Sequence, residues 1–287
     1  MEENWRKSDF EFFLINTVKA SINDNKWRNQ ILYSLEAGGK RFRPALCCLC
    51  GEALLIDSDS LFTIASAVEL LHTASLIHDD LPEIDNDDYR RGRLSHHKQF
   101  SHGTAVVAAD FIFFLAFELI MRLNSTALNH YFSRCSQDLA YGEYLDILME
   151  KGSEITQEEI EKMYEYKTAR LIEFSMSASS VLANKSDQHI QQIKGAGQNM
   201  GIAFQILDDL KGIEGRFEDI GKTPGKDIMN NKKTIPRILG INTSKELVIK
   251  KKNQCMDQLR FIKTIDGSDY ENVLDYLSMV WEKIEIA

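Results

Sequence analysis

Helical periodicity is the feature of this chain that most restricts its fold. Apolar residues recur at the three- and four-residue spacing of an amphipathic helix, and no long segment alternates apolar and polar residues as a strand does. Only four prolines interrupt the 287 residues. The clearest predicted helices span residues 61–77, 103–123, 155–182, 188–210 and 270–284. Thr156 and Glu159 have the spacing of a capping box at the start of the third. The sequence therefore predicts an all-α fold.

Several of the predicted helices are apolar on more than one side, as in the segment VVAADFIFFLAFELI (residues 106–120). Helices of this kind belong at the centre of a large bundle, because a surface helix keeps a polar face. No linker rich in proline, glycine or serine divides the chain, and no internal repeat of solenoid length is present. We therefore predict that residues 1–287 form a single domain, a large helical bundle.

The net charge of −9 and the pI near 5.4 limit the partners of the chain. Nucleic-acid binding needs a basic face, so we predict that the protein does not bind nucleic acid. A polyanionic substrate would be repelled by the overall field and must meet a local cluster of cations. The amino terminus, MEENWRKSDFEFF, is too acidic and too often interrupted by charge for a secretory signal.

Cysteine content and apolar run length indicate the compartment. The five cysteines are odd in number, and three of them lie in one apolar run, CCLC. This pattern fits neither a disulfide framework nor paired metal ligands, and it favours a reducing compartment. The longest apolar stretch, residues 105–120, contains Asp110 and Glu118 and is too short to span a membrane. We predict a soluble, cytoplasmic protein that does not span the membrane.

The segment HDDLPEIDNDDYRRG, residues 78–92, places six acidic side chains directly before two arginines. On a regular helix Asp79 and Asp85 would point roughly 120° apart, because each residue turns about 100°. Pro82 removes a backbone hydrogen bond and kinks a helix, so a bulged turn at residues 81–84 can bring Asp85 back beside Asp79. A half-buried carboxylate needs a cation, and oxygen-only ligands favour Mg²⁺, which bridges to phosphate oxygens. The alternative is a solvated acidic turn, against which the apolar residues before it argue.

A second acidic pair lies in the segment FQILDDLKG. Gln205, Asp208 and Asp209 fall on one helical face at three- and four-residue spacing, among residues of core type. One acidic pair on a helix is weak support for a metal site. Two pairs, each at the end of a strongly apolar helix, are much stronger support, and their chemistry requires them to face each other.

Several segments carry cations that match these carboxylates. The segment AGGKRFRP places Lys40, Arg41 and Arg43 after two glycines, which let the backbone approach an anion closely. Any one of these charges alone would fit a solvated surface. Together, two carboxylate groups and two separate cation groups indicate two bound diphosphates, one held through metal and the other directly. Further candidates for these sites are Arg90, Arg91, Lys167, Thr168, Lys222 and Lys226.

In their order along the chain, GGKRFRP, HTASLIHDDLPEIDNDDYRRG, KTARL, FQILDD and GKTPGKD resemble the motifs of the trans-isoprenyl diphosphate synthases. This family includes farnesyl and geranylgeranyl diphosphate synthases. The resemblance runs from about residue 35 to residue 240 and implies an all-α fold around a large central cavity, usually in a homodimer. It also implies Mg²⁺-dependent, head-to-tail condensation of isopentenyl diphosphate onto an allylic diphosphate.

The resemblance assigns roles to residues by motif position. Asp79 and Asp85, with Asp80 alongside, would hold Mg²⁺ on the allylic diphosphate, and Asp208 would bind the third ion. The other assignments, by substrate, are Arg90, Lys167 and Lys222 for the allylic diphosphate, Lys40, Arg43, His72 and Arg91 for isopentenyl diphosphate, and Thr168 and Gln205 along the reacting carbons.

Two positions depart from the family's pattern. The second acidic motif is DDxxD in the family but DDLKG here, so Gly212 stands one helical turn after Asp208 at the last carboxylate position. The family's GQxxD segment is GEYLD here, with Glu143 in place of the glutamine. Loss of the last aspartate would weaken the third metal site or a hydrogen bond to its ligands. We expect activity to survive, because Asp208 remains.

Ala74 and Ser75 are the candidates for setting product length. Ala74 is the fifth residue before Asp79 and lies about one helical turn deeper, where a growing hydrocarbon tail would descend. Farnesyl-producing relatives commonly place an aromatic ring there as a floor. Alanine leaves space, so we predict the twenty-carbon geranylgeranyl product over the fifteen-carbon farnesyl product. The phenylalanines in residues 111–117 are expected to be mostly core, and one of them is an alternative floor.

Two other functions compete with this interpretation. A class I terpene cyclase would use a similar aspartate-rich site, but it handles one diphosphate and has no use for GGKRFRP. A non-catalytic partner subunit of a prenyl synthase would fit Gly212 and Glu143, whereas the intact first acidic motif and the full cation set argue against it. Consumption of an allylic diphosphate alone would identify a cyclase.

Overall fold

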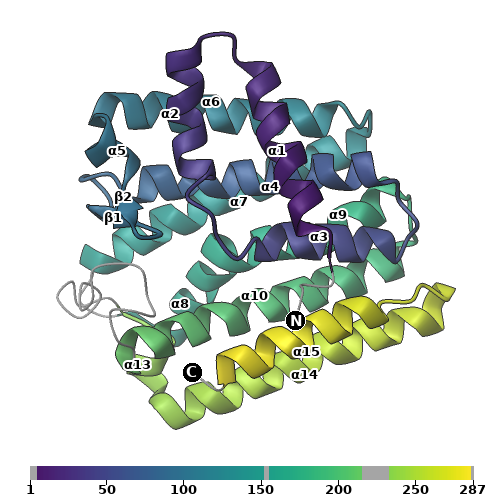
Figure 1. Ribbon diagram of the computed structural model, residues 1–287. Helices are drawn as coiled ribbons and strands as arrows, with labels where there is room; N and C mark the ends of the chain where they lie inside the picture. The colour runs from purple at the N-terminus through teal and green to yellow at the C-terminus, as the bar shows by residue number, and fades with distance from the viewer. Residues whose placement is uncertain (1–4, 152–154, 215–232, 286–287) are drawn as a thin grey trace. The chain divides into compact units, whose positions relative to one another are not determined.

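The computed structural model describes residues 5–151, 155–214 and 233–285, and it is built almost entirely of helices (Figure 1). The predicted all-α fold is confirmed. The chain divides into two compact units, which are described separately. The first unit comprises residues 1–45, 58–124 and 216–224, and the second comprises residues 46–57, 125–215 and 225–287. The single domain and the central cavity stay predictions.

The first unit is organised around its longest helix, α4 (Ser58–Asp79). This helix packs against α1, α2 and α6 and has buried residues on all sides, because it is apolar almost all round. The other elements of this unit are α1 (Lys7–Ser21), α2 (Asn25–Leu35), β1 (Tyr89–Arg90), β2 (Arg93–Leu94), α5 (His96–Gln99) and α6 (His102–Met121). α3 (Phe42–Glu52) begins in the first unit and continues into the second.

The second unit is organised around α10 (Asp187–Glu214), the longest of its helices. α10 packs against α14 along one side and against α9 and a π-helical turn, η1, along another. The elements around it are α7 (Thr126–Lys151), α8 (Gln157–Tyr164), η1 (Glu165–Ala169), α9 (Arg170–Leu182), α13 (Ile235–Leu239), α14 (Ile241–Asp266) and α15 (Glu271–Glu285).

The predicted helices correspond to observed ones, with one internal difference. The capping box at the start of α8 is present: Thr156 N–H donates to Glu159 Oε2 at 2.9 Å, and Glu159 N–H donates to Thr156 Oγ1 at 3.3 Å. The segment predicted as one helix, residues 155–182, is α8, η1 and α9 in succession. A π-helical turn adds a residue to a helix and occurs often at functional sites. Hydrophobic periodicity did not reveal it.

A two-residue hairpin between β1 and β2 was also not predicted. Its turn consists of Arg91 and Gly92, whose φ angles are 53° and 76°. Two consecutive residues with positive φ are what a type I′ turn requires, and glycine meets this requirement without strain. The hairpin places Arg90 on β1 and Arg91 in the turn, so the two arginines have different backbone conformations.

Burial accounts for the apolar sequence of α4 and for the cysteines, whereas α6, which was predicted at the centre of the bundle, is buried only in part. α4 and α6 are long and apolar enough to cross a membrane, but 72% and 44% of their apolar windows are buried inside the protein, and neither is a clear membrane span. All five cysteines are buried free thiols, and the CCLC run lies in α3. Burial raises the pKa of Cys255 to about 12, so this thiol stays protonated at neutral pH.

Candidate active site

The first acidic pair lies at the carboxyl end of α4. The helix ends at Asp79, and residues 80–87 then turn back on themselves. The backbone N–H of Asp85 donates to the carbonyl oxygen of Asp79 at 2.8 Å, which brings Asp85 back beside Asp79 as predicted. Pro82 lies within this turn, beyond the helix end, so it directs the return of the chain and does not kink α4.

Asp80 has a different environment from Asp79. Asp80 is buried, whereas Asp79 and Asp85 are half-buried. Arg90 Nε donates to Asp80 Oδ1 at 2.9 Å, and Arg90 Nη2 forms an ion pair with the same oxygen. Burial lowers the pKa of Arg90, but the hydrogen bond and negative charge of Asp80 outweigh this and raise the pKa above its ordinary value. Asp80 therefore anchors Arg90, which leaves Asp79 and Asp85 as the better candidates for metal binding.

The residues assigned to isopentenyl diphosphate include a histidine within a group of cations. Arg43 Nη1 lies 3.4 Å from His72 Nε2. Burial lowers the pKa of His72 well below its ordinary value, and the charges of Arg43 and Arg91 lower it further. A guanidinium can only donate, so the neutral His72 accepts this bond at Nε2. Lys40, the fourth residue of this set, is exposed.

The π-helical turn η1 carries Lys167, which was assigned to the allylic diphosphate. Lys167 Nζ lies 2.5 Å from Asp146 Oδ2 and 2.7 Å from Glu143 Oε2, both on α7. A Cβ on Gly142 would lie 2.1 Å from the backbone nitrogen of Lys167, so only glycine lets α7 approach η1 this closely. Because Glu143 replaces the family's glutamine, Lys167 faces two carboxylates.

A chain of hydrogen bonds connects η1 to the second acidic pair on α10. Thr168 Oγ1 donates to Gln205 Oε1 at 2.6 Å, and Gln205 Nε2 donates to Asp209 Oδ1 at 3.2 Å. The Tyr164 hydroxyl donates to the other oxygen of Asp209. Asp208 is exposed instead and has no hydrogen bond or ion pair with the part of the chain that the structure describes. The second pair therefore consists of an anchored carboxylate and an exposed one.

Sequence reasoning missed two of the residues that hold the site together. Tyr164 lies in YEYKTARL, three residues before Lys167, and burial raises its pKa far above the ordinary value, so its hydroxyl remains a donor. Glu69 is buried on α4 and contacts Arg41 and Arg91. The available signal was a charged residue inside the apolar run AVELLH, which predicts a buried ion pair but does not identify its partner.

Some of the predicted site cannot be compared with the structure. Lys222, Lys226 and the segment GKTPGKD lie outside the described residues. Asp79 belongs to the first unit and Asp208 to the second. That the two acidic pairs face each other across one cavity stays a prediction.

The carboxylates fit Mg²⁺ only if the substrate completes the site. Within the described residues, no group of three or more His, Cys, Asp or Glu side chains converges as a metal-binding cluster. Mg²⁺ is usually held by one or two carboxylates together with water and substrate phosphates. The two half-buried carboxylates of the first unit, Asp79 and Asp85, match that sparse donor set, and so does the single exposed carboxylate Asp208 in the second unit.

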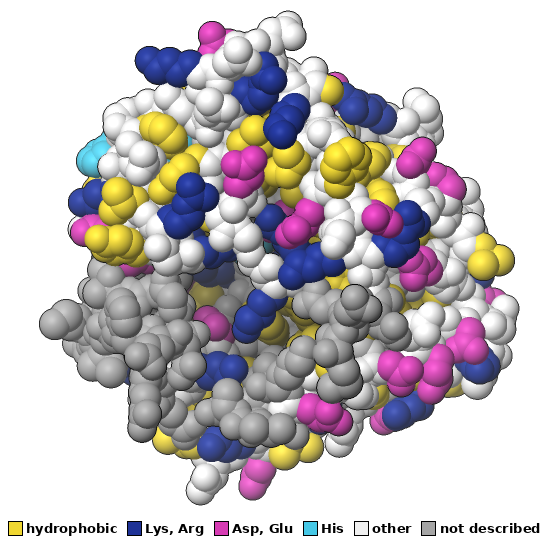
Figure 2. All heavy atoms as spheres, in the orientation of Figure 1, with side chains coloured by type: hydrophobic (Ala, Val, Ile, Leu, Met, Phe, Trp, Pro, Cys, Tyr) yellow, Lys and Arg dark blue, Asp and Glu magenta, His cyan; other side chains and the backbone are white. Residues whose placement is uncertain are grey.

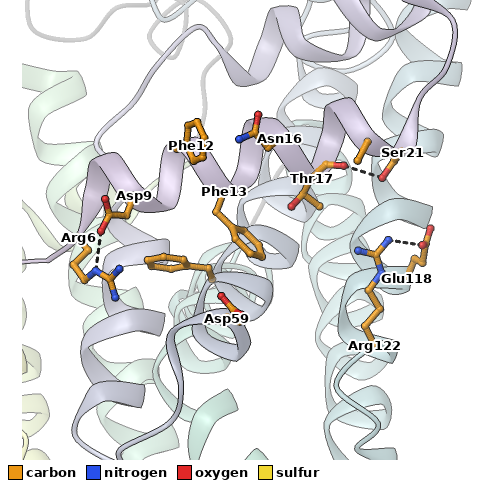
Figure 3. Close-up of a pocket in the computed structure, with 12 residues that line it drawn as sticks. Arg6, Asp9, Phe12, Phe13, Asn16, Thr17, Ser21, Asp59, Glu118 and Arg122 are labelled. Atoms are coloured by element: carbon orange, nitrogen blue, oxygen red, sulfur yellow. Dashed lines mark hydrogen bonds and ion pairs between the residues drawn. The ribbon is translucent and has the colours of Figure 1, made fainter.

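One groove of the first unit lies apart from the residues of the candidate site. It has a volume of about 860 Å³ and lies along α1, the start of α4 and the end of α6 (Figure 3). None of the predicted site residues lines it, and its charged side chains include the ion pairs Arg6–Asp9 and Glu118–Arg122. Figure 2 shows one face of the molecule, on which Lys and Arg side chains are interspersed with Asp and Glu side chains.

Comparisons with known proteins identify the family. The model of the polyprenyl synthetase family matches residues 25–266. The chain is 39% identical to a farnesyl diphosphate synthase of Micrococcus luteus, over 83% of this chain and 84% of the relative. It is 33% identical to a chloroplastic geranylgeranyl pyrophosphate synthase of Catharanthus roseus, over 88% and 76%.

A solved structure agrees with the sequence relatives. A geranyltransferase from Helicobacter pylori, complexed with magnesium and isoprenyl diphosphate, superposes with a TM-score of 0.79. It is 27% identical, and the alignment covers 96% of this chain and 95% of that one. An all-α fold with two acidic pairs, on α4 and its following turn and on α10, and such relatives define an enzyme of the prenyltransferase class. The chain belongs to the polyprenyl synthetase family.

Proposed function

We propose that the protein condenses isopentenyl diphosphate head-to-tail with an allylic diphosphate in an Mg²⁺-dependent reaction. The observation that supports this proposal most is that the two carboxylates of each acidic pair have different environments. Asp80 and Asp209 are anchored by Arg90 and Tyr164, whereas Asp79 is half-buried and Asp208 is exposed. We assign the half-buried Asp79 and the exposed Asp208 to a metal–diphosphate complex. The magnesium-bound Helicobacter pylori structure supports the use of a divalent metal.

The residues of the chain have separate tasks in this reaction. Lys40, Arg43 and Arg91 would bind isopentenyl diphosphate beside the neutral His72. Arg90 and Lys167 would bind the allylic diphosphate. Bound Mg²⁺, which we propose as three ions, supplies the neutralisation of charge that lets a diphosphate leave.

The reaction breaks the allylic C–O bond, and the bonding electrons leave with the diphosphate. The double bond of isopentenyl diphosphate then attacks the allylic carbocation and forms the new carbon–carbon bond. The departing diphosphate accepts the proton that the new cation loses. No buried side-chain base is needed for that proton, and the hydroxyl of Thr168 and the amide of Gln205 only line the path.

We propose geranylgeranyl diphosphate as the main product. Ala74 is fully buried on α4, one turn before His78, whose ring lies 5.5 Å from that of Phe113 on α6. The small side chain supports a deep tail channel at this position. The relatives include both farnesyl and geranylgeranyl synthases, so farnesyl diphosphate is the alternative product.

The protein is proposed to act as a cytoplasmic homodimer. The buried free thiols of all five cysteines support a reducing compartment. An exposed apolar row on α6 supports pairing with a second copy: Val107, Phe114 and Met121 are 57%, 75% and 55% exposed. These residues are seven apart and fall on one side of the helix.

The test of the proposed function is product analysis with purified protein, Mg²⁺ and both substrates. We expect a prenyl diphosphate longer than the allylic starter, and no product when Mg²⁺ is chelated. No turnover at any Mg²⁺ concentration would favour the non-catalytic partner subunit, for which Gly212 and Glu143 are the supporting features. Consumption of the allylic diphosphate without isopentenyl diphosphate would identify a cyclase instead.

A further inference from the structure

A buried glutamate lies behind the cations assigned to isopentenyl diphosphate. Glu69 of α4 is 2% exposed, so its carboxylate needs positively charged partners. Glu69 Oε1 accepts a hydrogen bond from Arg41 Nη1 at 2.5 Å and lies 3.8 Å from Arg91 Nη2. One carboxylate oxygen is therefore shared by guanidiniums from two segments that are far apart in the sequence.

Arg41 points into the protein and not toward a ligand. It is 5% exposed and also donates to the carbonyl oxygen of Leu35 at 2.6 Å and to Glu11 Oε1 at 3.3 Å. Its φ of 49° lies in the left-handed region, which a residue with a side chain adopts only where its contacts hold it there. Because Arg41 is fixed inward, its neighbours Lys40 and Arg43 provide the ligand-binding charges of this segment.

Arg91 lies near the same carboxylate oxygen and is held by further contacts of its own. Its Nη1 donates to the carbonyl oxygen of Gly38. A Cβ on Gly39 would lie 2.9 Å from Arg91 Cζ, so the missing side chain lets the guanidinium lie against the glycine backbone. Burial lowers the pKa of Arg91, and the negative charge of Glu69 opposes this effect. Glu69 therefore helps Arg91 to remain charged as well as in place.

We propose that Glu69 is a positioning residue for isopentenyl diphosphate. By binding one guanidinium from residues 38–43 and one from the β1–β2 turn, its carboxylate fixes the distance between Lys40 and Arg43 on one side and Arg91 on the other. Without that negative charge, Arg41 and Arg91 repel each other and the two cation groups separate. The inference rests on the proposed function and adds a residue that does not itself contact substrate.

The effect should be confined to one substrate. The cations assigned to the allylic diphosphate have their own carboxylates, since Arg90 pairs with Asp80, and Lys167 pairs with Asp146. Neither Arg90 nor Lys167 contacts Glu69 in the described part of the chain. A residue that only stabilises the fold would alter both subsites together, whereas a positioning residue for one diphosphate alters one.

The test is the Glu69→Gln variant, which keeps the size of the side chain and removes its charge. We expect the KM for isopentenyl diphosphate to rise roughly tenfold or more, while the KM for the allylic diphosphate changes less than about twofold. Glu11→Gln is the matched control. Glu11 contacts the same Arg41 at 3.3 Å but is 39% exposed at its side chain and has no contact with Arg91, so its KM values should stay near wild type.

A second variant separates positioning from folding. Glu69→Gln leaves Arg41 buried without its main partner, which destabilises the protein. In the Arg41→Gln/Glu69→Gln double variant both buried charges are absent, so the melting temperature should recover. The KM for isopentenyl diphosphate should remain high, because Arg91 still lacks its carboxylate. Recovery of that KM together with stability, or equal rises in both KM values, would overturn the inference.

Calorimetric titration of isopentenyl diphosphate into the same proteins compares their affinities for this substrate and does not require turnover. Tighter binding to wild type than to Glu69→Gln supports the positioning role even if the wild-type chain is inactive. An inactive wild type would then contradict the proposed function alone. Equal affinities for the two proteins would contradict the role of Glu69.

Discussion

Adjacent aspartates in this protein have different environments, and we expect this difference to decide which of them binds metal. In the second pair, Asp209 accepts hydrogen bonds from Tyr164 and Gln205, and its oxygens are oriented by these donors. Asp208 is exposed beside it. Placing one anchored carboxylate next to an exposed one fixes this part of α10 while leaving charge for a ligand.

The effect of the charge of Glu143 on Lys167 can be tested with a single substitution. Glu143 Oε2 is 2.7 Å from Lys167 Nζ, and under the proposed function it competes with a diphosphate for this ammonium. In the Glu143→Gln variant Lys167 keeps Asp146 but faces one negative charge fewer. For a half-exposed pair the gain is about 1 kcal/mol, so we expect the KM for the allylic diphosphate to fall about fivefold.

Steady-state kinetics with varied allylic diphosphate measures this change. Glu158→Gln, an exposed position on α8, removes the same charge from the surface and should leave the KM within experimental error. A higher KM in Glu143→Gln would show that Glu143 orients Lys167 for the substrate and does not compete with it.

Gly212 gives a second prediction at the scale of one residue. It lies on α10 one turn after Asp208, so an aspartate there would place a second carboxylate on the same helical face. We expect Gly212→Asp to lower the half-saturating Mg²⁺ concentration of condensation several-fold, because two carboxylates hold a divalent ion more tightly than one.

A magnesium titration of the condensation rate is the measurement. Gly212→Ala serves as the control, since it supplies the better helix propensity of a non-glycine residue without a carboxylate. An equal shift in both variants would assign the effect to the helix, and no shift in Gly212→Asp would place residue 212 away from the metal.

At the scale of elements, the sequence predicted the helices well and the turns between them less well. Long periodic segments such as residues 61–77 correspond to α4, because burial on several sides demands an apolar pattern. The π-helical turn η1 has no such pattern. Gly142 is the related feature of the sequence, because it lets α7 approach Lys167 of η1, but this role is recognisable only when that contact is known. Each strand of the β1–β2 hairpin has only two residues, which is too short to show an alternation of apolar and polar residues.

The sequence suggested ligands for the candidate site, which stay predictions, but it did not reveal the residues that support them. Asp79 and Lys167 stand in segments whose residue types suit phosphate chemistry. The partners that hold such residues, Glu69 among them, come from other helices, and a single sequence does not show which helices are neighbours. Arg41 is the instructive example: it lies between two ligand-type cations, yet it is buried and points inward.

We expect product length to depend on α4. Ala74 is buried one turn before the helix end, and Ser75 donates its hydroxyl to the carbonyl oxygen of His72 at 2.9 Å. If the hydrocarbon tail runs past Ala74, tyrosine fills that channel, and we expect Ala74→Tyr to shift the product from twenty to fifteen carbons. If Ala74 is in a closed core instead, tyrosine overpacks it at a cost of about 1–3 kcal/mol.

Product chromatography and thermal unfolding of the same variant distinguish these cases. A shorter product with a melting temperature near wild type supports the channel. Ser75→Tyr is the comparison, because its side chain leaves the helix about 100° away. An unchanged product in Ala74→Tyr, with a lower melting temperature, would place the floor elsewhere, such as at Phe113.

At the scale of the whole molecule, part of the apolar surface of α6 is exposed and is not buried by other described parts of the chain. Phe114, which sequence reasoning expected in the core, is 75% exposed. With Val107 and Met121 it forms a row along one side of the helix, interrupted by the exposed acids Asp110 and Glu118. Exposed apolar rows of this kind on a soluble protein commonly mark an interface.

The Phe114→Glu variant tests whether that interface is with a second copy. A symmetric pairing would place two copies of the row against each other, so one added charge per chain becomes two buried charges of the same sign at the contact. We expect wild type to elute as a dimer and Phe114→Glu as a folded monomer in size-exclusion chromatography with light scattering. Phe12→Glu is the matched control, because Phe12 is 74% exposed but lies on α1 and not on α6. A dimer that persists in Phe114→Glu, or a monomeric wild type that binds to lipid vesicles through α6, would exclude this face as the homodimer interface.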